Sequence, residues 1–543
     1  MTRRHAALCS CAALAVSACS TAGAREATFD VVEATILDMQ RAMEDGRVTS
    51  RGLVEAYLVR IAAYEEVLNA TMAVNPNALA VADSLDRERA AGRVRGPLHG
   101  IPIALKDNIQ TTDLPTTGGA LAFEGYIPPY DATLTENLRD AGAIILAKTV
   151  MTELANFIAY GMPGNYSAIG GYGMNPYDPR RDPRPQQGDG RPVMDPSGSS
   201  SGIGTAASFW AANVGTETSG SILWPANATM LAAIKPTVGR ISRWGVIPIT
   251  ADQDTPGPIA RTVTDAAILL GVLEGDIPDA HDDATARCAA PPDSDYTAFL
   301  NADGLRGARI GIPRLRSYRG MRPERLAVMD QAIEVLRGQG AVIVDPANIP
   351  SMVDPDPANN LFRAGASSVL HYGMKRDFNA WLGTLGETAP VRSLTELRAW
   401  NLAHARAGSL RYGQAQLDRS DTLSLDGADR ARYETDRARD LRLAAAHGID
   451  EVMTAMDLDA LLFLDAAGAD LSAMPGYPTV AVPLTRVPVP PNNVAPYPAG
   501  FEPKPVPMGV SFAGTACSEP RLIEIAYAFE QATRGRVPPE SVP

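Results

Sequence analysis

Histidine, cysteine and lysine are all scarce in this 543-residue chain, which holds six histidines, five cysteines and five lysines. Metal sites and phosphate-binding loops use fixed patterns of such residues, and the chain has no HExxH, paired CxxC, EF-hand or GxxxxGK[ST] motif. The acidic stretch DIPDAHDDA around His281 is better explained as a solvated loop than as a metal site. We therefore expect no metal and no organic cofactor.

Positive charge is also in short supply. The chain has 62 acidic residues against 49 lysines and arginines, and its formal net charge is −13. No basic face can be expected that would neutralise a phosphate backbone, so nucleic acid is an unsuitable partner. Beyond the first twenty residues no segment is apolar for the 18 or more residues that a membrane-spanning helix requires.

The first residues, MTRRHAALCSCAALAVSACS, resemble an export signal of the lipoprotein type, with two arginines, an apolar stretch and small residues before Cys19. Lipid on Cys19 would be the only attachment to a membrane, and the protein would face the periplasm or the cell surface. A plain secretory signal is the alternative. The expected organisation is a signal peptide at 1–18, a tether at 19–28 and a single catalytic domain at 29–543.

Helices and buried strands alternate along the mature chain, which predicts an α/β fold. Two amphipathic segments, VVEATILDMQRAMEDG and LVEAYLVRIAAYEEVL, predict an N-terminal helical layer. Helix–glycine–strand units follow in LTENLRDAGAIILAK and RLAVMDQAIEVLRGQGAVIV, and later strands are expected at ARIGIP, DALLFL, PTVAVPL and GVSFAG. Cys288 and Cys517 lie in the exported domain, and the sequence leaves open whether they pair.

Two proline-rich stretches, 175–196 and 487–507, interrupt this pattern and predict loop insertions. The first leads directly into a serine-rich run, so it is either the rim of a site or a solvated surface excursion.

The run DPSGSSSGIGTAAS at 195–208 is either a flexible linker or the wall of an active site. Residues 198–202 also satisfy GxSxG, the nucleophile elbow of α/β-hydrolases, with Ser200 at its centre. That motif needs a strand before it and a helix after it. IGTAASFWAAN suits a helix, but DGRPVMDPS is no strand, so the elbow is disfavoured.

Lys106 is the best candidate for a catalytic base. It follows an apolar run in HGIPIALKDNI, and burial would disfavour its ammonium form and free the amine to accept a proton. A salt bridge with Asp107 is the alternative. Downstream, GTETSGSILWPA places Ser221 in a glycine-flanked turn, where consecutive backbone N–H groups can converge on an oxyanion.

Jointly, HGIPIALKDNI, SGSSSG, GTETSGSILWPA, IKPTVGRIS and QDTPGPIARTVTDAA resemble the amidase signature family, from about residue 30 to the C-terminus. The segments RGPLHGIP and GTACSEPRLIEIAYAFEQATR are most similar to the bacterial peptide amidases within it. The resemblance implies an amidase signature fold, in which a large mixed β-sheet is surrounded by helices. It also implies a cis peptide bond before the bridging serine.

The same resemblance implies a Ser-Ser-Lys triad, with Ser221 as nucleophile, Ser199 as bridging serine and Lys106 as base. The segment between Ser199 and Ser221 is about two residues shorter than is usual in the family, so Ser200 is the fallback for the bridging role. The implied oxyanion hole and substrate-pocket residues are the backbone of Thr218, Ser219, Gly220 and Ser221, and the side chains of Ser200 and Trp224.

These observations predict a hydrolase that cleaves carboxamides through an acyl-enzyme. Its partner would be a small-molecule or peptide amide, either a peptide C-terminal amide or an aryl or acyl amide. An esterase that uses the same serine, or a catalytically silent lipoprotein that binds amides, are the alternatives. The oligomeric state is left open.

Overall fold

The computed structural model describes residues 29–275, 278–318, 320–488 and 496–543. The expected signal peptide, the tether and Cys19 lie outside these ranges. In the described part of the chain, no helix combines the length and the apolar character needed to cross a membrane.

An eleven-stranded mixed sheet forms the centre of the molecule, with the strand order β1-β3-β2-β6-β8-β7-β12-β13-β11-β9-β10. A separate pair, β4 and β5, lies outside it. The predicted α/β fold is therefore confirmed. The strands are β1 Thr71–Val74, β2 Pro102–Lys106, β3 Ile144–Thr149, β4 Tyr166–Ser167, β5 Gly171–Tyr172, β6 Ala212–Glu217, β7 Ala232–Lys235, β8 Thr255–Ala260, β9 Arg309–Gly311, β10 Val342–Val344, β11 Ala460–Leu464, β12 Thr479–Val487 and β13 Val506–Ala513.

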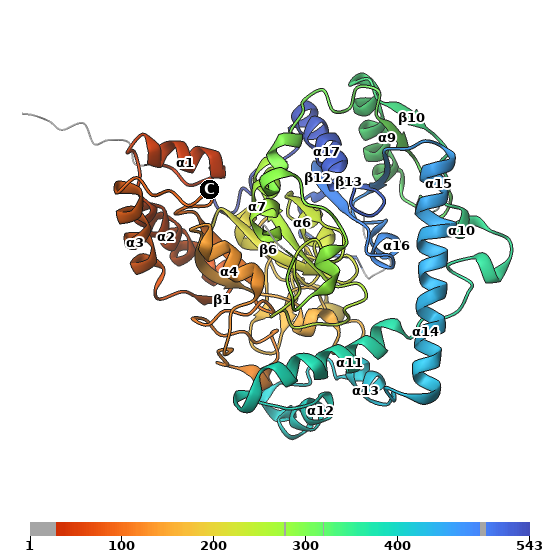
Figure 1. Ribbon diagram of the computed structural model, residues 1–543, viewed down its shortest axis with the longest axis horizontal. Coiled ribbons are helices and arrows are strands. Elements are labelled where there is room, and N and C mark those ends of the chain that lie inside the picture. Colours follow the sequence, from red (N-terminus) through yellow and green to blue (C-terminus); the bar gives the residue numbers. More distant parts are fainter. Residues whose placement is uncertain (1–28, 276–277, 319, 489–495) are drawn as a thin grey trace, which may run out of the picture.

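Helices surround the sheet (Figure 1). The apolar helix α7 is buried and packs on β7 and β8, and α17 packs on β12. The helices are α1 Ile36–Glu44, α2 Ser50–Leu68, α3 Ala78–Ala90, α4 Thr133–Asp140, α5 Ile203–Ala206, α6 Leu223–Ala228, α7 Val263–Glu274, α8 Arg314–Ser317, α9 Pro323–Gly338, α10 Pro350–Val353, α11 Val369–Thr384, α12 Leu394–Ala403, α13 Ala415–Asp421, α14 Gly427–Leu441, α15 Asp450–Ala455, α16 Ala469–Ala473 and α17 Glu519–Thr533.

The expected N-terminal helical layer is present as α1 to α3, grouped at one side of the molecule (Figure 1). The helix expected from residue 31 begins only at Ile36, because Thr35 caps it. The Thr35 hydroxyl accepts from the Asp38 amide, and the Asp38 carboxylate accepts from the Thr35 amide. The C-terminus lies beside this layer, where Arg60 donates to the carbonyl of Pro543 at 3.1 Å.

The helix expected in IGTAASFWAAN is limited to the single turn α5. Trp210 folds back on this turn, so a Cβ atom at Gly204 would lie 2.1 Å from the Trp210 ring. The Trp210 indole N–H donates to the Thr205 hydroxyl at 2.8 Å, and Ser208 has a φ of +54°, which ends the helix. The chain then enters β6. This expectation of a longer helix was wrong because the packing of Trp210 on Gly204 and Thr205 outweighed the helix propensity of the small residues.

The two proline-rich loops pack on each other. The Arg184 guanidinium lies 4.2 Å from the ring centroid of Tyr497, and Arg180 lies 4.3 Å from that of Phe501. The amide of Lys504 donates to Asp178 at 3.1 Å. The loop at 175–196 is therefore a packed layer rather than a solvated excursion.

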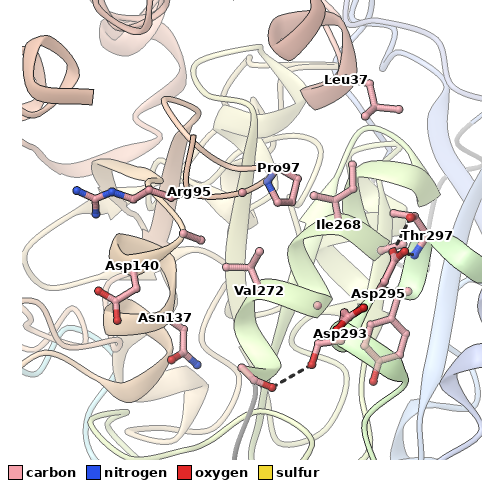
Figure 2. A pocket seen from close by; sticks show the side chains of 17 residues that line it. Leu37, Arg95, Pro97, Asn137, Asp140, Ile268, Val272, Asp293, Asp295 and Thr297 are labelled. Atoms are coloured by element: carbon pink, nitrogen blue, oxygen red, sulfur yellow. Dashed lines mark hydrogen bonds between the residues drawn. The ribbon is translucent and has the colours of Figure 1, made fainter. Parts of the chain in front are cut away.

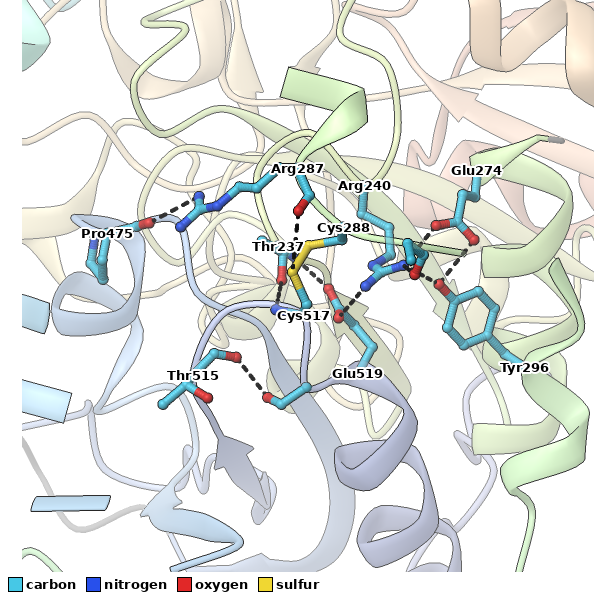
Figure 3. The surroundings of a disulfide bond; sticks show 12 residues. Thr237, Arg240, Glu274, Arg287, Cys288, Tyr296, Pro475, Thr515, Cys517 and Glu519 are labelled. Atoms are coloured by element: carbon cyan, nitrogen blue, oxygen red, sulfur yellow. Dashed lines mark hydrogen bonds and ion pairs between the residues drawn. A yellow bond between two sulfur atoms is a disulfide. The ribbon is translucent and has the colours of Figure 1, made fainter. Parts of the chain in front are cut away.

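Cys288 and Cys517 form a disulfide with 5.6 Å between their Cα atoms (Figure 3). The bond joins positions 229 residues apart in the sequence, and disulfides that close long loops typically contribute about 2–4 kcal/mol by restricting the unfolded chain. Next to it, the buried Arg240 guanidinium lies between Glu274 and Glu519, at 2.7 and 3.0 Å. The pairing that the sequence left open is therefore made.

Candidate active site

Two neighbouring parallel strands bring the candidate catalytic residues together. Strand β2 ends at Lys106, and β6, which pairs with it in parallel, ends at Glu217, directly before the turn that carries Ser221. The carboxyl ends of parallel strands lie at the same edge of a sheet, which is where α/β proteins commonly build their sites. Residues more than 110 positions apart in the sequence therefore meet at one edge.

Lys106 is fully buried and contacts only neutral partners. Its Nζ lies 3.1 Å from Ser199 Oγ, 2.8 Å from Thr216 Oγ1 and 3.0 Å from the Thr216 carbonyl oxygen. A neutral amine satisfies all three contacts by donating twice to Thr216 and accepting from the Ser199 hydroxyl. Burial lowers the pKa of Lys106 to about 7, against the opposing influence of Asp254 and Glu217.

The salt bridge considered for Lys106 is not formed. Asp107 faces Lys148 instead, with 3.4 Å between Asp107 Oδ1 and Lys148 Nζ, and it also accepts from the Thr117 hydroxyl. Within the described ranges Lys106 has no carboxylate within ion-pair distance. A buried lysine without an ionic partner is a functional-site candidate, because the charged form is penalised and not compensated.

Ser199 and Ser200 have different environments although they are neighbours. Ser199 contacts Lys106, whereas Ser200 is clipped to the backbone of Thr216: its hydroxyl donates to the Thr216 carbonyl at 3.0 Å and accepts from the Thr216 amide at 3.1 Å. Both side chains are fully buried. The geometry therefore brings Ser199, and not the fallback Ser200, to Lys106.

The chain enters Ser199 through two residues in the left-handed region. Ser197 has a φ of +57° and Gly198 one of +60°, a conformation that is strained for serine. The cis peptide bond implied before Ser199 is not found, since the one cis bond in the described residues joins Asp345 to Pro346. That expectation was wrong, and the chain reversal is made by positive φ angles instead.

Ser221 lies in a turn that offers free backbone donors. The amides of Ile222 and Leu223 donate to the Glu217 carboxylate at 2.8 and 3.0 Å, and the Gly220 amide also stabilises that carboxylate. For Thr218, Ser219 and Ser221, the described chain supplies no acceptor to the backbone N–H. Three of the four expected oxyanion donors are therefore available to a ligand.

The turn that carries Ser221 is held against the serine run. The Ser200 amide donates to the Ser221 carbonyl at 3.1 Å, which fixes the two segments side by side. Between the hydroxyls of Ser199 and Ser221, both within the described chain, no hydrogen bond is formed. Ser221 is 9% exposed.

Trp224 and Asp470 border the turn on its outer side. Trp224 is 38% exposed, and a Cβ atom at Gly220 would lie 2.4 Å from its indole ring, so the ring covers the turn directly. The Ser219 hydroxyl donates to the Asp470 carboxylate. An aromatic face and a carboxylate therefore lie beside the turn that carries Ser221.

Sequence reasoning missed Thr216, Glu217, Gln253 and Asp254, all of which lie in or beside the site. Gln253 donates from its amide to the Thr218 carbonyl at 3.1 Å, and Asp254 accepts from the Thr218 hydroxyl. All four lie within GTETSGS and QDTPGP, so the motifs contained them, but their roles depend on contacts across the sheet.

His281 belongs to a stack of rings and to no metal cluster. Its ring lies 4.4 Å from that of Trp244, and its Nδ1 lies 3.0 Å from Asp279. Over the described ranges no group of three or more His, Cys, Asp or Glu side chains is arranged to hold a metal ion.

A surface hollow of about 680 Å³ between α4 and α7 (Figure 2) is lined by none of Lys106, Ser199 and Ser221.

Comparison with known proteins agrees with this architecture. The amidase family model matches residues 52–523. A probable amidase of Arabidopsis thaliana is 36% identical over 524 residues, covering 95% of this chain and 93% of the relative. The crystal structure of peptide amidase from Stenotrophomonas maltophilia is 38% identical with a TM-score of 0.80, covering 94% of this chain and 98% of that chain.

The fold and the buried Lys–Ser site, taken with these comparisons, define a hydrolase of carbon–nitrogen amide bonds. Within that class, the chain belongs to the amidase signature family. A second structure of peptide amidase, in complex with the competitive inhibitor chymostatin, is also 38% identical, with a TM-score of 0.81 over 94% of this chain and all of that chain.

Proposed function

We propose that the protein hydrolyses carboxamides through a triad in which Ser221 is the nucleophile, Ser199 the bridging serine and Lys106 the base. One observation carries this assignment: Lys106 Nζ lies 3.1 Å from Ser199 Oγ in a fully buried setting without an ionic partner. A lysine with a pKa near 7 is partly neutral at neutral pH and can take a proton there.

The reaction then follows from the geometry. Neutral Lys106 takes the proton of Ser199, Ser199 takes that of Ser221, and the Ser221 oxygen bonds to the amide carbonyl carbon. The oxyanion accepts from the free N–H groups of the turn, where loss of one donor typically costs about 3 kcal/mol. As the C–N bond breaks, Lys106 returns the proton through Ser199 to the leaving amine. Water then hydrolyses the acyl-enzyme.

The substrate class is a peptide C-terminal amide or an aryl or acyl amide. The similarity to peptide amidase supports a peptide amide, and the exposed face of Trp224 beside Ser221 supports an acyl group that packs on an aromatic ring. Ser200, also considered for the substrate pocket, is fully buried and clipped to Thr216, so Trp224 is the stronger candidate for lining it.

A panel of amides and matched esters tests the activity. We expect release of ammonia from peptide C-terminal amides, and of the amine from aryl amides, because the site is built to protonate a leaving nitrogen. Ammonia and free acid are measured together for each substrate. Turnover of the esters alone would show an esterase, and no turnover of either class would show a protein that only binds amides.

We also propose that the protein is exported and anchored by lipid on Cys19. The segment Val16–Cys19 has the form of a lipoprotein cleavage site, and the Cys288–Cys517 disulfide suits an oxidising compartment outside the cytosol. Attachment through a lipid would hold the folded domain at a membrane surface while the active site stays accessible to soluble amides.

Metabolic labelling with a fatty acid tests this anchor. We expect label in the wild-type protein and none in Cys19→Ala, since the acyl chain needs that thiol. In membrane fractionation, the wild-type protein should be found in the membrane fraction and Cys19→Ala in the soluble fraction. The variant should retain hydrolytic activity. Label that persists in Cys19→Ala, or a wild-type protein without label, would contradict the proposal.

A further inference from the structure

A small chamber lies next to the base. Its volume is about 10 Å³, which matches a single water molecule, and its lining includes Asn108, Thr216, Thr218 and Asp254. Thr216 is also the residue to which Lys106 donates twice. One residue therefore separates the chamber from the amine of the base.

Asn108 has an unsatisfied acceptor at this chamber. Its side chain is 2% exposed, and its Nδ2 donates to Thr216 Oγ1 at 3.0 Å and to the Ile247 carbonyl at 3.3 Å. Its Oδ1 is buried and has no partner in the described chain. A buried acceptor in a chamber of this size calls for a donor such as water, because leaving it unpaired costs free energy.

Asp254 lines the chamber and also touches the nucleophile turn. Its carboxylate accepts from the Thr218 hydroxyl at 2.5 Å and from the amides of Ile249 and Thr250 at 2.8 and 2.9 Å. It is 8% exposed, and burial raises its pKa to about 7. Three donors hold this carboxylate in place, so its position relative to the turn is well defined.

Among the charged groups near Lys106, Asp254 is the anion that raises the pKa of Lys106 most. Asp377 on α11 acts on Asp254 as a like charge, and Arg243, which also lines the chamber, is ion-paired with Asp282. On β6, Glu217 also stabilises the ammonium, but less than Asp254, and it faces Lys235. Two further cations, Arg376 and Arg437, bind Asp252 on the same loop as Asp254.

We propose that Asp254 is a positioning residue of the hydrolytic reaction. It holds the nucleophile turn through Thr218, and its negative charge stabilises the ammonium that Lys106 becomes when it takes the serine proton. The chamber has room for one water to donate to Asn108 Oδ1. The inference rests on the proposed function of Lys106 as base.

A second cavity adjoins the chamber. It has a volume of about 210 Å³, is lined by Tyr130, Trp244 and Trp381 among others, and shares Arg243, Val246 and Asp254 with the chamber. Asp254 therefore borders both cavities.

The pH dependence of Asp254→Asn tests the inference. The base must be neutral, so wild-type kcat/KM should rise as pH increases through about 7, the pKa of Lys106. Asp254 also has a pKa of about 7, so its negative charge is present on the upper part of the wild-type limb. In the variant the ammonium loses that anion, so the pKa of Lys106 falls and the acidic limb moves to lower pH, by about one unit. The Asn amide can accept from Ile249 and Thr250 and donate to Thr218, so the turn remains supported.

Asp252→Asn is the matched control, because it removes a carboxylate from the same loop that binds Arg376, Arg437 and Tyr433 instead. Its acidic limb should coincide with that of the wild type. Asp254→Ser, small and neutral, is the second variant and must shift the limb in the same direction as Asp254→Asn.

A lower plateau with an unmoved limb in both Asp254 variants would reduce Asp254 to a structural residue and overturn the inference. Labelling by a fluorophosphonate separates this failure from that of the proposed function. If the wild-type protein is labelled at Ser221 and the limb does not move, only the role of Asp254 is wrong. If wild-type Ser221 is not labelled, the triad itself is wrong.

Discussion

Ser221→Ala should abolish amide hydrolysis, lowering kcat by about 10⁴- to 10⁶-fold as in other serine hydrolases that lose their nucleophile. The alanine removes the oxygen that would form the acyl-enzyme, while the free N–H groups of the turn and the bond from the Ser200 amide to the residue-221 carbonyl remain. Intact mass spectrometry with a fluorophosphonate measures this directly. The wild-type protein should gain one adduct that maps to Ser221, and the variant should gain none.

Ser201→Ala is a suitable control for this experiment. Ser201 belongs to the same buried run, and its hydroxyl only accepts from the Ile203 amide at 3.3 Å. We expect this variant to be labelled and active within a few-fold of the wild type. An adduct on Ser200 would contradict the triad and favour the nucleophile elbow, in which Ser200 is the nucleophile. A wild-type protein that is active but not labelled would exclude an activated serine.

Lys106→Met should lower kcat/KM by at least about 10³-fold, the upper part of the range that a general base contributes. Methionine fills a similar buried volume without charge, so the loss reports the missing proton acceptor rather than a cavity. Lys106→Arg should be equally inactive, because a guanidinium stays protonated and cannot accept a proton from Ser199. Fluorophosphonate labelling rates at several pH values measure both variants.

The residual activity of Lys106→Met should also lose the part of the rise through pH 7 that deprotonation of Lys106 contributes. Thermal unfolding of each variant shows whether the fold is kept. A folded Lys106→Met protein that retains most of the wild-type labelling rate and the same acidic limb would mean that another group activates Ser221.

Much of the fold follows from local pattern, because its strands are short buried runs bounded by glycine and proline. The strands expected at ARIGIP, DALLFL, PTVAVPL and GVSFAG correspond to β9, β11, β12 and β13. Lys106 could be singled out for a similar reason: a lysine after an apolar run is placed at the buried end of a strand. Its burial and its short distance to Ser199 agree with that argument.

The sequence could not distinguish the roles of residues that differ only in their contacts with other strands of the sheet. Ser199 and Ser200 are adjacent serines, and nothing local tells which of them faces the base. The distinction depends on Thr216, a residue on β6. Its hydroxyl and carbonyl oxygens accept from Lys106, while its amide and the same carbonyl oxygen bind the Ser200 hydroxyl. The roles of Asp254 and of the Cys288–Cys517 pair are likewise set by tertiary contacts.

The clip between Ser200 and Thr216 has a consequence for how this enzyme can diverge. A Cβ atom at Gly215 would lie 2.7 Å from Ser200 Oγ, so even a methyl group cannot be added beside the clip without displacing it. Larger side chains in the inner part of the site, formed by β2, β6 and the serine run, are therefore excluded by steric clashes. We expect changes that alter which amides are accepted to accumulate outside it, around the exposed Trp224 and Asp470, because surface substitutions usually change the free energy of unfolding little. The molecule thus combines a tightly packed inner part that tolerates few substitutions with an outer surface that tolerates many.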